Sequence, residues 1–195
     1  MESAHIKTEQ NVGISLVNGT NDREAYPKRW IAVLVQANCE KRSASQLNKL
    51  HYETFIPIQQ EVHQWSDRKK KIDRLVMPMI VFVRATVREE EWLRNQSFIY
   101  KLLALPGSKE DKRKFATPIP DVQIERLKFL LANAETEVTI VKDLKVGDAV
   151  HVVQGPLKGL EGVVCEADEK NSIVGVLIDG LGYACVKIAK DYLSC

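Results

Sequence analysis

The sequence predicts an α+β protein of two domains, an N-terminal α/β sandwich with a largely antiparallel sheet and a small β-barrel behind it. From residue 30 to residue 134, short apolar runs alternate with segments of helical period. Beyond about residue 135 the helical period is lost, and short β-type runs are separated by turn signals, of which Asp179-Gly180 is a strong hairpin dipeptide. The first pattern is typical of helices packed on one sheet, and the second is typical of a barrel.

Composition places the chain among ordinary globular proteins. Its 195 residues are 45% apolar and 28% charged, with a formal net charge of +2. Contact with nucleic acid would therefore depend on local basic patches rather than on a global field. No run reaches the ~18 apolar residues of a membrane span, and the N-terminus lacks the pattern of a signal peptide. We expect a cytoplasmic monomer without a membrane partner.

The residues that usually carry chemistry form no recognisable site. The four cysteines are Cys39, Cys165, Cys185 and Cys195, with no C-x-x-C spacing, so we predict no metal site. Free thiols in a reducing compartment are favoured, and a Cys165–Cys185 disulfide remains the alternative. The histidines are dispersed, and no G-x-S-x-G, P-loop or H-E-x-x-H pattern occurs. The sequence thus predicts no catalytic residue, no cofactor and no enzyme.

The first domain is expected over residues 25–134, after a flexible polar extension at residues 1–24. Residues 30–35 form an apolar run that predicts a buried strand, and Asn38 is a candidate N-cap for a helix over 40–50. Two strands, 55–65 and 75–84, flank a basic tip at 66–71 and predict a hairpin. Pro78 is expected to interrupt the second strand and bend it.

The rest of this domain contains two helices and one strand. Thr86 and Glu89 match a capping box at the start of a short helix. Residues 99–105 predict a strand, and Pro120 suits the first turn of a last helix, whose apolar residues recur at helical spacing. We expect a mobile linker at 135–143 and a barrel domain at 144–195.

The barrel segment contains the sharpest motif. Residues 147–164, GDAVHVVQGPLKGLEGVV, are similar to a KOW motif, which belongs to small SH3-like barrels. Its motif residues are Gly155, Pro156, Lys158, Gly159 and Gly162. Gly155 and Gly159 permit a tight excursion between strands, and Gly162 opens the returning strand where a side chain would crowd the barrel. A generic barrel with glycine turns is the plainer interpretation. Seven glycines and Pro156 oppose a helical state of this domain.

Three segments of the first domain resemble the NusG family. KRWIAV at 28–33 is similar to its first strand, LVMPMIVFV at 75–83 to its central strand, and ATPIPD at 116–121 to the entry of its last helix. The resemblance runs from Lys28 to the C-terminus. Met79 and Ile80 depart from the usual pattern, and the short basic hairpin tip looks more like the specialised RfaH- and UpxY-type antiterminators than the housekeeping factor.

This resemblance implies a transcription antitermination or elongation factor that binds RNA polymerase at the clamp helices of its largest subunit. Such a factor suppresses pausing or termination, here on specific operons such as those for capsular polysaccharide. The apolar patch that matches the docking site consists of Trp30, Leu34, Met77, Ile80 and Phe82, and we expect it to be open. The alternative is that these side chains are simply core.

Basic residues provide the expected contacts with non-template DNA or nascent RNA, through attraction to phosphate. They are Arg42, Lys49, Arg68, Lys69, Lys70, Lys71 and Arg74. The plainer alternative is a solvated loop that protects a strand edge. For the KOW domain the resemblance implies a ribosomal protein or a termination factor as partner. Two other functions stay open: a housekeeping NusG-type factor, and a KOW-containing ribosome-associated RNA-binding protein, against which the near-neutral charge argues.

Overall fold

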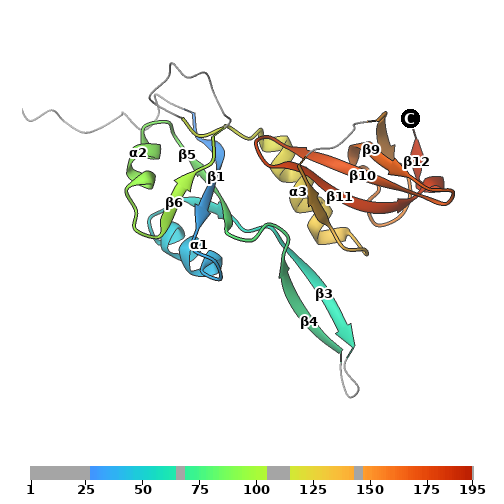
Figure 1. Ribbon diagram of the computed structural model, residues 1–195, viewed down its shortest axis with the longest axis horizontal. Coiled ribbons are helices and arrows are strands. Elements are labelled where there is room, and N and C mark those ends of the chain that lie inside the picture. Colours follow the sequence, from blue (N-terminus) through green and yellow to red (C-terminus); the bar gives the residue numbers. More distant parts are fainter. Residues whose placement is uncertain (1–26, 65–68, 105–114, 143–146, 195) are drawn as a thin grey trace, which may run out of the picture.

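The structure is a computed structural model that describes residues 27–64, 69–104, 115–142 and 147–194. An N-terminal sheet with its helices occupies one end of the molecule, a second sheet occupies the other end, and helix α3 lies between them (Figure 1). The predicted α+β class is therefore confirmed. The expected extension at 1–24 lies outside the described residues. No helix in the described ranges is long and apolar enough to cross a membrane.

The N-terminal sheet has four antiparallel strands in the order β2-β5-β1-β6. They are β1 (Arg29–Val35), β2 (Glu53–Phe55), β5 (Ile80–Ala85) and β6 (Ile99–Leu102). Strand β1 is buried on both faces, as its unbroken apolar run predicts. Ile31, Val33 and Val35 share one cluster with residues of α1 (Glu40–Lys49) and α2 (Glu89–Arg94), whereas Trp30 and Ala32 share another with α3 (Asp121–Asn133).

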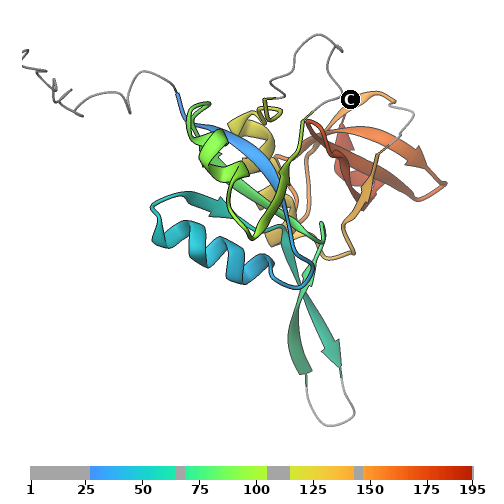
Figure 2. The same cartoon turned by 60° about the vertical axis from the view of Figure 1, so that its left-hand side comes forward.

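The hairpin differs from the prediction in its second strand. Strand β3 (Ile58–Gln64) pairs with β4 (Lys69–Leu75), and the hairpin extends away from the sheet (Figures 1 and 2). The basic run at 69–71 belongs to β4 rather than to the tip. The apolar stretch at 75–84 is not one strand, because the chain turns at 76–79 before β5 begins. Met79 takes the left-handed conformation, with φ of 65°, and Pro78 precedes it.

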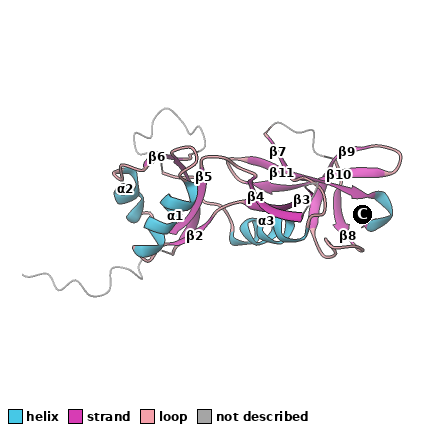
Figure 3. Ribbon diagram, turned by 90° about the horizontal axis from the view of Figure 1, so that it is seen from below, coloured by secondary structure: helices cyan, strands magenta, loops and turns pink. Residues whose placement is uncertain are grey.

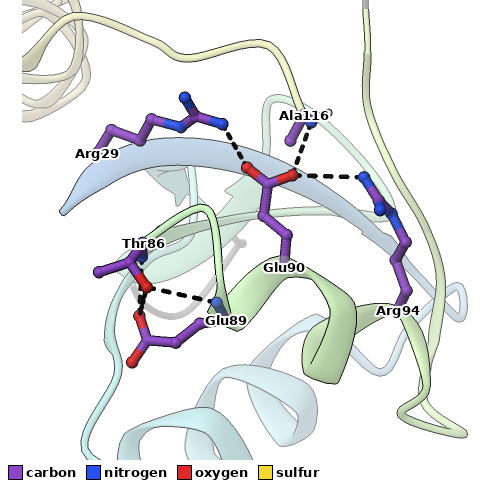
Figure 4. A network of polar contacts seen from close by, with 6 residues as sticks. All are labelled: Arg29, Thr86, Glu89, Glu90, Arg94 and Ala116. Carbon is purple, nitrogen blue, oxygen red and sulfur yellow. Dashed lines mark hydrogen bonds and ion pairs between the residues drawn. The ribbon is translucent and has the colours of Figure 1, made fainter. Parts of the chain in front are cut away.

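Thr86 and Glu89 form the reciprocal bonds of the predicted capping box, although α2 itself begins at Glu89 with Arg88 in the N-cap position (Figure 4). The Thr86 N–H donates to Glu89 Oε2 at 2.8 Å, and the Glu89 N–H donates to Thr86 Oγ1 at 3.3 Å. The Asn38 prediction for α1 is wrong. Cys39 is the N-cap, no side chain caps the helix, and Asn38 itself has φ of 62°.

Glu90 joins three parts of the first domain through one carboxylate (Figure 4). Its side chain is 1% exposed and accepts hydrogen bonds from Arg29 at 2.5 Å, from Arg94 at 3.3 Å and from the Ala116 N–H at 2.9 Å. A charge this buried is tolerated because it is paired and hydrogen-bonded. The contacts tie α2 to the start of β1 and to the segment that leads into α3.

The second sheet, which we call the barrel after the predicted domain, has six antiparallel strands in the order β12-β8-β9-β10-β11-β7 (Figure 3). They are β7 (Thr139–Val141), β8 (Ala149–Val152), β9 (Glu161–Ala167), β10 (Asn171–Ile178), β11 (Gly182–Ala189) and β12 (Leu193–Ser194). Alternate residues such as Val174 and Val176 on β10 are fully buried in the core. The β10–β11 turn contains the predicted Asp179–Gly180 pair, with Gly180 at φ of 78°.

Candidate functional site

The five residues of the apolar patch lie on β1, on β5 and in the turn before β5. Strand register places Leu34 opposite Ile80 and Ala32 opposite Phe82. Trp30 and Leu34 are an even number of residues apart, so they point to the same face of the sheet. Ile80 and Phe82 project from β5 toward that face too, and all belong to or pack against one hydrophobic cluster. The structure thus brings together the residues that the sequence singled out.

The patch is covered rather than open. Trp30 is 3% exposed, Met77 5%, Ile80 6% and Phe82 0%, and Leu34 is half-buried. The same cluster contains four residues of α3 and most of the barrel core, including Val150 and Ile178. The expectation of an open patch is therefore wrong for this conformation, because α3 and the barrel share one continuous apolar core with the sheet.

An aromatic rim at the edge of this face was missed by sequence reasoning. Phe55 on β2 is half-buried and stacks on Phe82, with ring centroids 5.7 Å apart. The exposed Lys128 of α3 places its Nζ 5.0 Å from the Trp30 ring centroid and 5.3 Å from that of Phe55. Phe129 beside it is 37% exposed. The exposure of Phe129 could have been predicted from the sequence, because this residue falls outside the apolar stripe of α3.

The turn that carries Met77 is held by a buried carboxylate. Glu40 is 3% exposed, and its Oε1 accepts the Met79 N–H at 2.8 Å. The Met79 carbonyl accepts the Val35 N–H, also at 2.8 Å. These bonds fix a non-glycine residue at positive φ, a conformation that the surroundings must stabilise. Helix α1 therefore positions the turn at 76–79 relative to β1.

The predicted basic residues that the structure describes lie on two elements, α1 and β4. Arg42 and Lys49 are exposed on α1 and Lys71 is exposed on β4. Lys69 and Lys70 also belong to β4, and Arg68 lies outside the described residues.

Arg74 is instead part of an internal network at the base of the hairpin. It forms ion pairs with Glu61 and, at 3.1 Å, with Glu137. Its guanidinium also donates to Gln59 Oε1 at 2.7 Å and to the Val138 carbonyl at 2.9 Å. These contacts fix the hairpin base against the segment that leads into the barrel, and they leave Arg74 poorly suited to phosphate binding.

The KOW residues shape one corner of the barrel. Gly155 and Gly159 have φ of 79° and 91°, so both occupy the left-handed region that favours glycine. A Cβ on Gly162 would lie 2.7 Å from Val174 Cγ1 and 2.8 Å from the Gly175 carbonyl oxygen. Pro156 and Lys158 are exposed at the same turn. The glycines are therefore required by conformation and by space, and Lys158 is the charged group that this turn presents to solvent.

Polar contacts hold the barrel on the first domain. The Gln59 amide donates to the Thr136 carbonyl at 2.8 Å, and the Asp179 N–H of the barrel donates to Gln123 Oε1 on α3 at 2.9 Å. Arg126 of α3 forms an ion pair with Glu161 of β9. The segment 135–143, expected to be a mobile linker, includes β7, and its first residues take part in these contacts.

Comparison with known proteins identifies the family. Residues 28–128 match the family model described as the transcription termination factor nusG. The chain belongs to the NusG family. The "Transcription termination/antitermination protein NusG" of Vibrio vulnificus is 26% identical over 170 residues, which cover 83% of this chain and 91% of that protein. Its counterpart in Escherichia coli K12 is 25% identical over 170 residues, covering 83% and 92%.

Among solved structures, the one titled "Domain interaction in Thermotoga maritima NusG" is similar to this chain, with a TM-score of 0.49 and 20% identity. The match covers 86% of this chain and 96% of that one. The family match and the named relatives support the conclusion that this chain is a NusG-type transcription factor. The family match covers the patch on β1 and β5, the basic residues of α1 and β4, and most of α3.

Proposed function

We propose that this NusG-type factor binds RNA polymerase at the clamp helices of its largest subunit and suppresses pausing or termination. The docking surface is the face of β1 and β5 that carries Trp30, Leu34, Ile80 and Phe82, with Met77 in the adjoining turn. The observation that carries the proposal is the register that places Leu34 beside Ile80 and groups these side chains on one face. Aromatic rings and methionine bind a helical surface without charge matching.

Docking requires this face to be uncovered, because the patch is buried in a core that it shares with α3 and the barrel. The junction also contains a small number of polar contacts, and the Arg126–Glu161 pair is partly exposed. Exposed pairs contribute little to stability. We therefore propose that residues 25–134 and 144–195 act as separate domains once polymerase binds. The released KOW barrel then takes a second partner, a ribosomal protein or a termination factor.

The exposed basic residues of α1 and β4 provide contacts with non-template DNA or nascent RNA beside the docked polymerase. Arg42, Lys49 and Lys71 are exposed in the described conformation, so their side chains can approach phosphate. Arg74 is excluded from this set because its guanidinium is already engaged.

Purification of the tagged full-length chain from cells tests the binding partner. RNA polymerase subunits should co-purify, and the Ile80→Ala variant should recover less of them at equal expression. Recovery of ribosomal particles without polymerase would favour the ribosome-associated function instead.

Action on specific operons, such as those for capsular polysaccharide, is the finer part of the proposal. A housekeeping NusG function is the second candidate, because the relatives found carry that name. Mapping the chromosomal occupancy of the tagged chain separates the two. A specialised factor should follow polymerase on a few operons, and a housekeeping factor should follow it on most transcribed genes.

A further inference from the structure

Two cysteines of the barrel meet on the face of the sheet that points away from the core. Cys165 lies on β9 and Cys185 on β11, and their sulfur atoms are 3.9 Å apart. Ala184 and Val186 point into the core, so Cys185 between them lies on the opposite face of the sheet, where it is nevertheless buried. The thiols are 20 residues apart in sequence, and only the sheet brings them together.

Gly175 makes this meeting possible. It lies on β10, between the two cysteine strands, and pairs directly with Cys185. A Cβ at Gly175 would lie 2.6 Å from the Cys165 sulfur, far inside van der Waals contact. Any other residue at this position would therefore push the Cys165 thiol away from that of Cys185.

A direct disulfide does not fit this arrangement. Strands β9 and β11 are not neighbours, since β10 separates them. Adjacent strands lie about 4.8 Å apart, so Cα atoms two strands apart are separated by about 9–10 Å. A disulfide needs a Cα–Cα distance of about 4.4–6.8 Å. The sulfurs can be joined through an inserted atom without moving the strands, but they cannot be bonded to each other.

A metal ion of the right size fits between the sulfurs. Metal–sulfur bonds of about 2.3 Å span about 3.8 Å at a tetrahedral angle and about 4.6 Å in a straight line. The observed separation of 3.9 Å lies near the lower end of this range, so the two sulfurs would hold an ion in a bent arrangement. Among the described residues there is no group of three or more His, Cys, Asp or Glu side chains that could hold a metal. A structural zinc ion needs four such ligands, whereas soft thiolates select copper(I).

We propose that Cys165 and Cys185 bind one copper(I) ion as a two-coordinate dithiolate on the barrel. Each thiol gives its proton to solvent as its sulfur–copper bond forms, and copper stays in the +1 state, so no oxidant or reductant is consumed. Two protons leave for each ion bound. The ion links β9 to β11 across β10 and stabilises the folded barrel, because the unfolded chain does not hold the two thiols together.

The surroundings of the two thiols allow an ion to enter. Cys165 is half-exposed and gives access from solvent, whereas Cys185 is 2% exposed. Thiolate is a soft ligand that favours copper(I), whereas harder ions prefer oxygen ligands.

Competition with a chelator tests the site on the full-length chain. The parent protein for this test carries Cys39→Ser and Cys195→Ser, so that only the proposed pair remains. Copper(I) is offered anaerobically as its bicinchoninate complex, and the loss of the complex's absorbance measures transfer. We expect one equivalent of copper per chain, and Cys165→Ala should weaken binding at least tenfold. Failure of the parent to remove copper, or unchanged affinity of the Cys165→Ala protein, would overturn the proposal.

Thermal unfolding gives a second readout that does not depend on the chelator. Copper(I) should raise the unfolding midpoint of the parent by several degrees and leave that of Cys165→Ala and Cys185→Ala unchanged. Circular dichroism establishes that each variant is folded, and Cys165→Ala decides the question alone if the buried Cys185 variant unfolds. An equal rise with zinc, or a rise in the folded Cys165→Ala protein, would contradict a two-coordinate copper site.

Discussion

Gln59 Oε1 accepts two hydrogen bonds, one from the Arg74 guanidinium at 2.7 Å and one from the Val138 N–H at 3.0 Å. Gln59 is 3% exposed at the base of the hairpin, and Val138 is fully buried at the entrance to the barrel. A single amide oxygen thus connects both strands of the hairpin to the segment that leads into the second sheet. This connection is one of the polar contacts that hold the barrel on the first domain.

Gln59→Ala should weaken the junction between the two sheets. The Val138 N–H would lose its acceptor while buried, which costs about 1–3 kcal/mol. Denaturant unfolding should show this loss, and hydrogen exchange at Val138 should accelerate more than exchange in the middle of β1. Gln60→Ala is the matched control, because Gln60 is the exposed neighbour on the same strand. Equal stability of the two variants would show that the amide does not hold the junction.

Glu90→Gln should destabilise the first domain, whereas the same change at the neighbouring Glu91 should have little effect. The variant leaves Arg29 and Arg94 without their buried carboxylate. Both guanidinium groups are partly exposed, so we expect about 1–3 kcal/mol rather than the larger cost of breaking a fully buried pair. Glu91→Gln changes an exposed side chain on the same helix. The free energies of unfolding of the two variants should differ, and identical values would refute the role of the Glu90 network.

Gly162→Ala should destabilise the barrel by steric conflict. The added methyl group meets Val174 Cγ1 and the Gly175 carbonyl at less than 3.0 Å. Overpacking of this kind costs about 1–3 kcal/mol. Lys158→Ala, an exposed change in the same motif, should leave stability nearly unchanged. Thermal unfolding compares them, and a stable Gly162→Ala protein would mean that the strand has room for a side chain.

Replacement of Lys69, Lys70 and Lys71 by Ser should lower the affinity for elongation complexes and flatten its dependence on salt. Each lost phosphate contact reduces the slope of log K against log salt by roughly 0.7–0.9. The matched control replaces three exposed lysines elsewhere, Lys101, Lys170 and Lys190. Salt titrations of binding provide the measurement. Equal slopes for both triple variants would show that the lysines of β4 do not contact phosphate and only help to keep the protein soluble.

Local patterns in the sequence predicted much of the fold. The capping box at Thr86 and Glu89, the buried strand β1 and the Asp179–Gly180 turn depend on neighbouring residues and were confirmed. The break at 76–79 was predicted only as a bend at Pro78, because the apolar run continues through it. That break depends on Glu40, far away in sequence, which binds the Met79 N–H.

The candidate site was predicted in its residues but not in its surroundings. Strand alternation cannot tell whether another element such as α3 covers an apolar face, so the burial of Trp30 and Ile80 could not be inferred. The role of Arg74 was missed for the same reason. Its partners Gln59 and Val138 come together only through the pairing of β3 with β4 and the path of the chain after α3.

Photo-crosslinking from the rim of the patch tests the central claim most directly. p-Benzoylphenylalanine replaces Phe55 on β2 in one variant and Tyr100 on β6 in the other, so the probes lie at opposite edges of the same sheet. Tyr100 is 58% exposed, which makes it the more accessible position in the absence of a specific partner. With RNA polymerase present, the Phe55 probe should crosslink to the largest subunit and the Tyr100 probe should not. No crosslink from Phe55, or an equal yield from Tyr100, would contradict docking through the face of β1 and β5.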